Sequence, residues 1–344
     1  MTQRKTQSNI DKPQNSLALA DVSYVAGIDI GATNLRLALA DMAGAVIARW
    51  SSSTAGIRSA DPVIALIREG VASLLHQVAA PPHALKAVAA GAPGITDVDE
   101  GIVIATSYLM GWRNVPLRAL LEDALGAPAV VDNDVNLAAI GESWIGAARG
   151  ARDFVFLAIG TGIGASIVLN GAPFRGTNWA AGEIGYMLVP GTSDGPGNHG
   201  EPGALESLIG GEGIKTQWQK LWHSHRTELA KDLTATQIFD HALAGDALAQ
   251  QILQQTARML SHAVYNITLV LNCPLFVLGG GVGVHPALCR ATQALLEQRN
   301  MRSQPQLTPS ALGTDAQLMG ALRLALDTAA SRPALFADQG AGRE

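Results

Sequence analysis

Three glycine-rich turns, each at the end of a short apolar run, constrain this chain more than any other feature of its sequence. They are Gly31-Ala32-Thr33-Asn34 after residues 25–30, Gly160–Gly164 after 154–159, and Gly279–Gly281 after 275–278. Glycines let backbone N–H groups approach an anion closely, and a threonine hydroxyl adds a donor. Each turn alone is compatible with an ordinary hairpin connection. Three of them at strand ends, two with a Gly-Thr element, favour a phosphate site.

The amino-acid composition excludes several classes of protein. Glycine supplies 37 of 344 residues, above the average of roughly 7%, but without the three-residue period of collagen. Hydrophobic residues make up 48% of the chain, too many for a disordered protein. The formal net charge of −5 argues against a nucleic-acid-binding surface spread over the whole chain, so no nucleic-acid partner is expected.

The ends of the chain and its most apolar stretch predict neither a membrane-spanning segment nor a secretory signal. Residues 1–22 are polar and lack the apolar segment of a secretory signal, so we expect a disordered N-terminal tail, and 331–344 resemble a loose C-terminal tail. The apolar stretch 267–284 is interrupted by Asn272, Pro274 and glycines, and is not expected to span a bilayer. Two cysteines form no disulfide framework, which favours a reducing, cytoplasmic compartment.

Apolar periodicity predicts an alternation of strands and helices. The expected strands are 25–30, 35–40, 45–50, 87–92, 129–131, 154–159, 165–169 and 275–278, and the expected helices are 62–79 with Asp61 as its N-cap, 116–125, 135–145, most of 208–271, and 316–330. A strand, a Gly-Thr turn and a second strand occur near residue 30 and again near residue 160, which is a weak internal repeat. We therefore expect an α/β protein with two lobes, each a mixed sheet flanked by helices.

Asp29 ends the first apolar run and directly precedes the first glycine turn. A carboxylate beside a phosphate site is suited to a magnesium ion that lies between them and is reached through water. The alternative is a structural role as an Asx-type turn cap. We favour the metal role, and group Asp29 with Gly31, Thr33 and Asn34.

The segment Asp132-Asn133-Asp134 follows another buried strand and leads into a helix. Ligands of α/β proteins commonly lie at such strand ends. Asp134 either caps the helix or, beside phosphate turns, accepts the proton of a hydroxyl nucleophile, as kinases require.

Two further carboxylates, Glu183 and Glu206, stand in glycine-rich and otherwise apolar segments. Buried charges need partners, and a hydroxyl-rich ligand such as a sugar supplies them. The spacing alone is equally compatible with two solvated loop acids.

Taken in order, these motifs resemble the ROK family of sugar kinases, within the actin-like ATPase and hexokinase superfamily, over about residues 24–328. The motifs are Gly27–Asn34, Gly91–Gly94, Gly111-Trp112, Asp132–Asn136, Gly141-Glu142, Gly160–Gly164, Gly182–Gly185, Leu278–Val282 and Met319–Ala321. The resemblance implies two RNase H-like lobes with an active site in the cleft, and a homodimer. The small N-terminal lobe would be 23–134, joined by helix 316–330, and the large C-terminal lobe 135–315.

The resemblance also implies ATP and Mg²⁺ as cofactors, with transfer of the γ-phosphate to a hexose hydroxyl. That hydroxyl is usually the 6-OH of glucose or of a related hexose or N-acetylhexosamine. Asp134 would then be the general base. The implied phosphate and nucleotide positions are Asp29, Gly31, Thr33, Asn34, Gly160, Thr161, Gly162, Gly280 and Gly281, and the implied sugar positions are Gly94, Asn133, Glu183, Tyr186 and Glu206.

Three departures from the family pattern concern zinc and sugar binding. Tyr186 stands where the family usually has a zinc-binding histidine, and the family's three cysteines are absent from the matching segment 197–206, where His199 falls at one cysteine position. Because all four ligands of the pattern are missing, we predict that the chain has no zinc site. Tyr108 stands at a usual sugar-contacting asparagine, so the identity of the sugar is left open.

Two functions are compatible with the sequence. An ATP-dependent sugar kinase is favoured by Asp134 and by the two glycine turns that contain a Gly-Thr element. A sugar-binding sensor with little or no catalysis is the alternative, because tyrosines stand at two sugar-contact positions. ROK repressors carry a DNA-binding domain before this core, and residues 1–22 are too short for one, so DNA binding is not expected.

Overall fold

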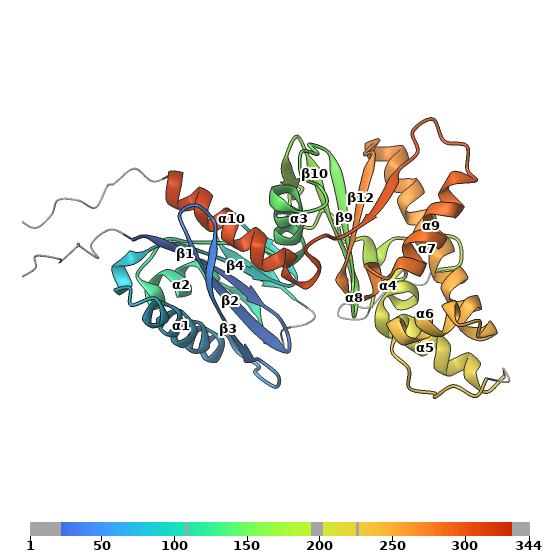
Figure 1. The fold of residues 1–344 in the computed structure, drawn as a ribbon, viewed down its shortest axis with the longest axis horizontal. Helices are drawn as coiled ribbons and strands as arrows, with labels where there is room; N and C mark the ends of the chain where they lie inside the picture. Colours follow the sequence, from blue (N-terminus) through green and yellow to red (C-terminus); the bar gives the residue numbers. More distant parts are fainter. Residues whose placement is uncertain (1–21, 107–108, 110, 194–201, 225–226, 332–344) are drawn as a thin grey trace, which may run out of the picture.

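The computed structural model describes residues 22–106, 109, 111–193, 202–224 and 227–331. Its first five-stranded sheet has the order β3-β2-β1-β4-β8, and Figure 1 shows it in blue and cyan. β1, β2 and β3 form an antiparallel meander, and β4 and β8 extend the sheet in parallel. The strands are β1 Tyr24–Ile30, β2 Asn34–Asp41, β3 Val46–Ser53, β4 Leu85–Ala92 and β8 Ala129–Asn133.

The second five-stranded sheet, in the order β11-β10-β9-β12-β13, repeats this topology strand for strand. Its strands are β9 Phe154–Ile159, β10 Ile163–Leu169, β11 Ala172–Phe174, β12 Leu275–Gly279 and β13 Gln306–Pro309. β9 to β11 form the meander, and β12 and β13 are parallel to β9. The internal repeat predicted from the two Gly-Thr turns is therefore confirmed, and so is the α/β class with mixed sheets.

The first sheet is covered by helices from both ends of the chain. α1 (Ala60–Gln77) and α2 (Leu117–Leu125) bury their apolar residues against one face. α10 (Ala316–Ser331) covers the other face beside α3 (Asp134–Ile145), and Figure 1 shows α10, in red, lying across the blue strands. A β-carbon on Gly320 would lie 1.7 Å from the carbonyl oxygen of Leu137, so α3 and α10 approach each other backbone to backbone.

The second sheet is covered mainly by the helices between β11 and β13. They are α4 Glu206–Ile209, α5 Gly211–Trp222, α6 Ala235–Leu243, α7 Ala247–Leu271, α8 Gly280–Gly283 and α9 Pro286–Glu297. Large buried side chains, among them Trp218, Phe239 and Phe276, fill the core between these helices and the sheet. None of the helices in the described part of the chain is long and apolar enough to cross a bilayer.

A buried carboxylate ties together two segments that connect the sheets. Glu142, near the end of α3, accepts hydrogen bonds from the backbone N–H groups of Ala147 (2.6 Å), Leu312 (3.0 Å) and Ala311 (3.3 Å), and from the hydroxyl of Ser310. Residues 310–312 lie between β13 and α10, whereas Ala147 lies between α3 and β9. Glu142 is fully buried, and these four donors compensate its charge.

Several elements differ in detail from the sequence expectation. α1 begins at Ala60, with Ser59 rather than Asp61 at its N-cap. Ile163 and Gly164, expected in a turn, open strand β10, and Gly279 ends β12. The sequence also did not predict strands β11 and β13 of the second sheet. Other short elements that it missed are the sheet of β5 (Ile95–Asp97), β6 (Ile102–Ala105) and β7 (Arg113–Val115), and the 3-10 turns η1 (Pro82–Ala84), η2 (Ile184–Tyr186) and η3 (Gly313–Asp315).

Candidate active site

Asp134 is the first residue of α3, directly after β8. The N-cap of this helix is Asn133, whose Oδ1 accepts from the N–H groups of Val135 (2.8 Å) and Asn136 (3.2 Å). The cap role that the sequence left open for Asp134 therefore belongs to its neighbour. Asp134 Oδ1 itself accepts from Val135 N at 3.0 Å.

The surroundings of Asp134 make its carboxyl an unusually weak acid. Burial raises its pKa from the ordinary 3.8 to about 7, and the negative charges of Asp29 and Glu183 add to this effect. The charges of two other predicted site acids, one on β1 and one in the loop before η2, therefore affect the carboxyl of Asp134. A carboxylate with a pKa near neutrality is suited to accept a proton from a hydroxyl group.

Asp29 has a partner that the sequence interpretation missed. Arg36 of β2 donates from Nε to Asp29 Oδ2 at 2.8 Å, and from Nη1 to the carbonyl of Thr314 at 2.6 Å. Burial raises the pKa of Asp29, and the guanidinium of Arg36 opposes this increase. The two residues face each other in the antiparallel register of β1 and β2. Opposite charges at paired positions of two adjacent strands were the available sequence signal.

The first glycine turn is held by hydrogen bonds of its own and by Thr54. Gly31 N donates to the carbonyl of Asn34 (2.9 Å), and the hydroxyl of Thr54 donates to the carbonyl of Gly31 (2.7 Å). Asn34 Nδ2 donates to the hydroxyl oxygen of Thr33 (3.1 Å), and both side chains are exposed. This exposure leaves the Thr33 hydroxyl accessible to a ligand at the end of the sheet.

The second and third glycine turns lie side by side. Gly160 N donates to Gly162 O (3.0 Å), and Thr161 between them is exposed. Gly280 has a φ of +76°, and a β-carbon there would lie 2.4 Å from the carbonyl oxygen of Ile159, the residue before Gly160. Gly281 has open space where its β-carbon would lie. The two turns thus offer backbone groups next to a side-chain-free surface.

The predicted sugar residues form two groups. Asn133 Nδ2 donates to the carbonyl of Gly94 at 2.8 Å, which joins these two positions. Glu206 Oε2 accepts from Ile163 N at 3.0 Å. Burial raises the pKa of Glu183, and the negative charge of the nearby Glu206 adds to this effect. Tyr186 is half-exposed.

Some sequence predictions fall outside the described residues. They concern Tyr108 and His199. Most of the segment that corresponds to the family's cysteines also lies outside the described residues. The described residues contain no group of three or more His, Cys, Asp or Glu side chains arranged to hold a metal ion. The absence of zinc stays a prediction.

A chain of polar side chains that begins at Asp132, two residues before Asp134, joins the two sheets. The buried carboxylate of Asp132 in β8 is paired with Arg175, which follows β11. Asp132 Oδ1 accepts from Asn136 Nδ2 (2.9 Å), and Asn136 Oδ1 accepts from the hydroxyl of Ser166 in β10 (2.8 Å). Arg175 and Ser166 were not among the residues selected from the sequence.

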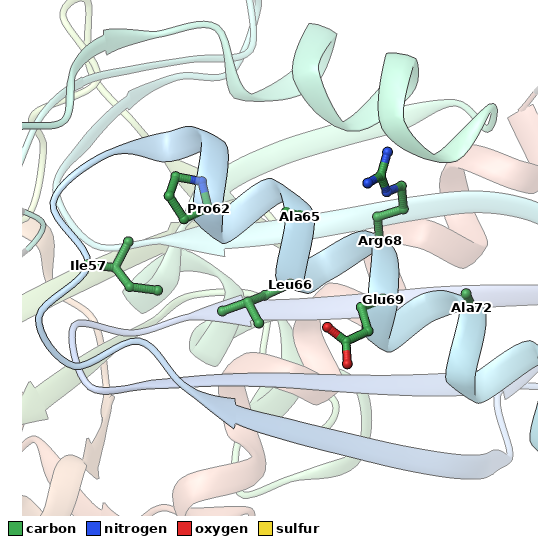
Figure 2. A pocket seen from close by; sticks show the side chains of 7 residues that line it. All are labelled: Ile57, Pro62, Ala65, Leu66, Arg68, Glu69 and Ala72. Carbon is green, nitrogen blue, oxygen red and sulfur yellow. The ribbon is translucent and has the colours of Figure 1, made fainter.

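A shallow hollow elsewhere on the surface does not coincide with these groups. Figure 2 shows it on the outer side of α1, with Ile57 from the preceding loop and Pro62, Leu66, Arg68 and Glu69 among the side chains around it. None of the residues that line it belongs to the predicted phosphate or sugar positions.

Comparison with known proteins places the whole described core in one family. A model of the ROK family matches residues 25–328. The glucokinase of Halalkalibacterium halodurans is 34% identical over 275 residues, which cover 77% of this chain and 82% of that protein. The xylose repressor of Caldicellulosiruptor bescii is 24% identical over 75% of this chain and 66% of its own length.

A solved structure shows the same fold. The ROK family glucokinase of Streptomyces griseus, in complex with glucose and AMPPNP, superposes with a TM-score of 0.74 at 24% identity. The match covers 89% of this chain and 100% of that one. It confirms the fold class expected from the sequence.

Proposed function

This chain belongs to the ROK family, and from that membership we propose that it is an ATP-dependent sugar kinase. It transfers the γ-phosphate to a hexose hydroxyl, the 6-OH of glucose or of a related hexose or N-acetylhexosamine. The observation that carries the proposal is Asp134, whose pKa of about 7 suits a general base and which stands among the predicted phosphate and sugar positions. The glucokinase of H. halodurans, at 34% identity, supports the same reaction.

In the proposed mechanism, Asp134 accepts the proton of the acceptor hydroxyl as its oxygen attacks the γ-phosphate in line. Phosphoryl transfer depends mostly on placing the two reactants and on stabilising charge. A base that is partly ionised near neutrality is matched to the late removal of a hydroxyl proton. The N-cap of Asn133 and the hydrogen bond from Val135 N hold the backbone and the carboxylate of this base in place.

The phosphate side is assigned to the glycine turns. Gly31, Thr33 and Asn34 in the first turn, and Gly160, Thr161 and Gly162 in the second, would bind phosphate oxygens, with Gly280 and Gly281 beside the adenosine. AMPPNP in the S. griseus enzyme supports a nucleotide here. The oxygen donors of Asp29 and Thr33 suit Mg²⁺, which Asp29 would hold through water and which would neutralise charge on the phosphates. Arg36 keeps Asp29 oriented.

The sugar side is assigned to the remaining carboxylates and amides. Glu183 and Glu206 would accept hydrogen bonds from sugar hydroxyls, and the effect of the charge of Glu206 on the pKa of Glu183 supports a shared site for the two acids. Asn133 keeps one amide proton beyond its bond to Gly94 and would donate it to the sugar. Tyr186 would cover the sugar with a phenol in place of the usual imidazole.

The decisive test is Asp134→Asn, with Asp123→Asn on the exposed face of α2 as the matched control. ADP release is measured against a panel of hexoses and N-acetylhexosamines, and sugar binding is measured by calorimetry. We expect the control to behave as the wild type, and Asp134→Asn to lose turnover while it keeps sugar affinity. An unchanged turnover number would remove Asp134 from the mechanism.

A sugar-binding sensor is the second candidate, favoured by Tyr186 and by the xylose repressor among the relatives. A wild-type protein that binds ATP and a sugar but releases no ADP with any sugar of the panel would support the sensor. The proposal further includes the two lobes divided at Asp134, a homodimer, a cytoplasmic location and no zinc. Each of these follows from the sequence and the family resemblance.

A further inference from the structure

One ion pair joins the edge strands of the two sheets directly beside the proposed base. Arg175 follows β11, the edge of the second sheet, and donates from Nη2 to Oδ2 of Asp132 in β8, the edge of the first. The side chain of Asp132 is 2% exposed and that of Arg175 27%. Arg175 Nη1 also donates to the carbonyl of Pro173 (3.3 Å), which anchors the guanidinium to its own strand.

Asp132 also forms hydrogen bonds with residues on both sides of Asp134. Its Oδ1 accepts from the backbone N–H of Asn133 at 2.8 Å and from Nδ2 of Asn136 at 2.9 Å. Asn133 precedes Asp134, and Asn136 follows it by two positions within the first turn of α3. The backbone that carries Asp134 is thus held at two points by one carboxylate, and that carboxylate is held by Arg175.

Stability alone is a weak reason for such a pair. Removing two charges from water costs free energy that their attraction often fails to recover, and apolar replacements of buried pairs are frequently neutral or stabilising. The pair instead fixes position, because it joins a strand end of one sheet to the strand edge of the other. The charges that raise the pKa of Asp134 come from Asp29 and Glu183. Arg175 is not among the groups that shift the pKa of Asp134, so its contacts bear on the position of this residue.

We propose that Arg175 is a positioning residue for phosphoryl transfer: through Asp132 it fixes the Asp134 carboxylate against the acceptor hydroxyl without touching sugar or nucleotide. The proposal rests on the proposed function. Displacement of a reacting group by ~1 Å is enough to reduce a rate by about 100-fold. Loss of Arg175 should therefore lower kcat more than it changes the KM for the sugar, which Asn133 would bind, and leave the KM for ATP unchanged.

The experiment first compares wild type with Asp134→Asn, which decides whether the chain is a kinase that uses this base. It then measures kcat, both KM values and the pH profile for Arg175→Met, Arg175→Lys and the exposed control Arg152→Met. We expect Arg175→Met to lower kcat by about 100-fold, the KM for ATP to stay within about twofold, and the midpoint of the pH profile to stay unchanged. The KM for the sugar should change by less than kcat does, because Asn133 is also held by Asp132. Arg175→Lys should recover part of kcat, because it keeps a cation, and Arg152→Met should match the wild type.

The double variant Asp132→Asn/Arg175→Met covers the case in which an unpaired Asp132 prevents folding. It contains no buried charge at this point, and the amide oxygen introduced at position 132 can still accept from Asn133 and Asn136. If the double variant loses no more kcat than the more impaired of the two single variants, Asp132 and Arg175 act on Asp134 through the same set of contacts. Three results would each overturn the inference. They are a wild-type kcat in the folded double variant, a changed KM with constant kcat in Arg175→Met, and losses of kcat in the single variants that multiply in the double variant. A wild-type protein without phosphoryl transfer overturns the proposed function, and this inference with it.

Discussion

Replacing Asp134 by asparagine should make the protein more stable while it abolishes phosphoryl transfer. Burial, together with the charges of Asp29 and Glu183, raises the pKa of Asp134 to about 7 from an ordinary 3.8. A carboxyl whose pKa is higher in the folded than in the unfolded chain destabilises the fold when it is ionised. Asparagine removes this charge and keeps an oxygen for the hydrogen bond from Val135 N.

The magnitude follows from the difference between the two pKa values of Asp134. They lie about 3 pH units apart, and at ~1.4 kcal/mol per pH unit the upper bound is about 4 kcal/mol. Asp134 is only partly shielded from solvent, which screens the interaction and reduces the expected gain to ~2 kcal/mol. At about 2 °C of Tm for each kcal/mol in a chain of this size, the variant should melt about 4 °C higher.

The pH dependence gives this prediction its sign. Below about pH 4 the carboxyl is protonated in both the folded and the unfolded chain, so wild type and Asp134→Asn should have the same Tm. The wild type should lose its relative stability as the pH rises to about 7, and the difference should stay constant above that value. Thermal unfolding without ligands measures this, with Asp123→Asn as a control. A Tm difference that is independent of pH, or a variant that is less stable at about pH 8, would refute the reasoning.

Four further outcomes are expected. The kcat of the wild type should rise with pH around a midpoint near the pKa of Asp134, about 7, because only the ionised base accepts the proton; a flat profile measured with saturating substrates contradicts this. Gly320→Ala should lower stability by about 2 kcal/mol in denaturant unfolding, because its β-carbon would overlap the carbonyl of Leu137. Glu142→Gln should cost about 3 kcal/mol, because its amide would face backbone N–H donors, and an unchanged denaturation midpoint would show that those bonds contribute nothing. Metal analysis of the purified protein should find no zinc, whereas one tightly bound zinc ion per chain would contradict the prediction.

Long buried strands were the elements that the sequence predicted best. β9 spans Phe154–Ile159, as expected, because a strand buried on both faces is a continuous apolar run. The three strands β5, β6 and β7 were missed, since they have three or four residues each and no periodicity is measurable over that length. The N-cap of α1 was placed two residues late, because Asp61-Pro62 has the composition of a cap although the helix begins at Ala60.

In the candidate site too, the sequence predicted residues that follow a local pattern and missed residues that meet only through the tertiary fold. Asp134 was identified because it follows a buried strand, and the structure places it within electrostatic reach of Asp29 and Glu183. The sequence allowed Asp134 to be the N-cap, whereas the N-cap is the preceding residue, Asn133. Sequence periodicity does not locate the start of a helix to within one residue. Arg175 carried no signal, because it lies 43 positions from Asp132 and meets it only when two sheets assemble.

The position of α10 has a consequence for the order in which the protein is made. The helix is translated after the entire second sheet, yet its apolar residues complete the packing of β1 and β4, which leave the ribosome before that sheet. The first sheet thus waits with one face only partly covered, by α3, while the rest of the chain is synthesised at ~5–20 residues per second. The second sheet waits for less of the chain, because its strands begin at Phe154 and its core includes Ala316 at the start of α10, whereas the first sheet begins at Tyr24 and its packing is completed by the whole of α10. During this interval the first sheet exposes apolar surface that the finished protein buries under α10.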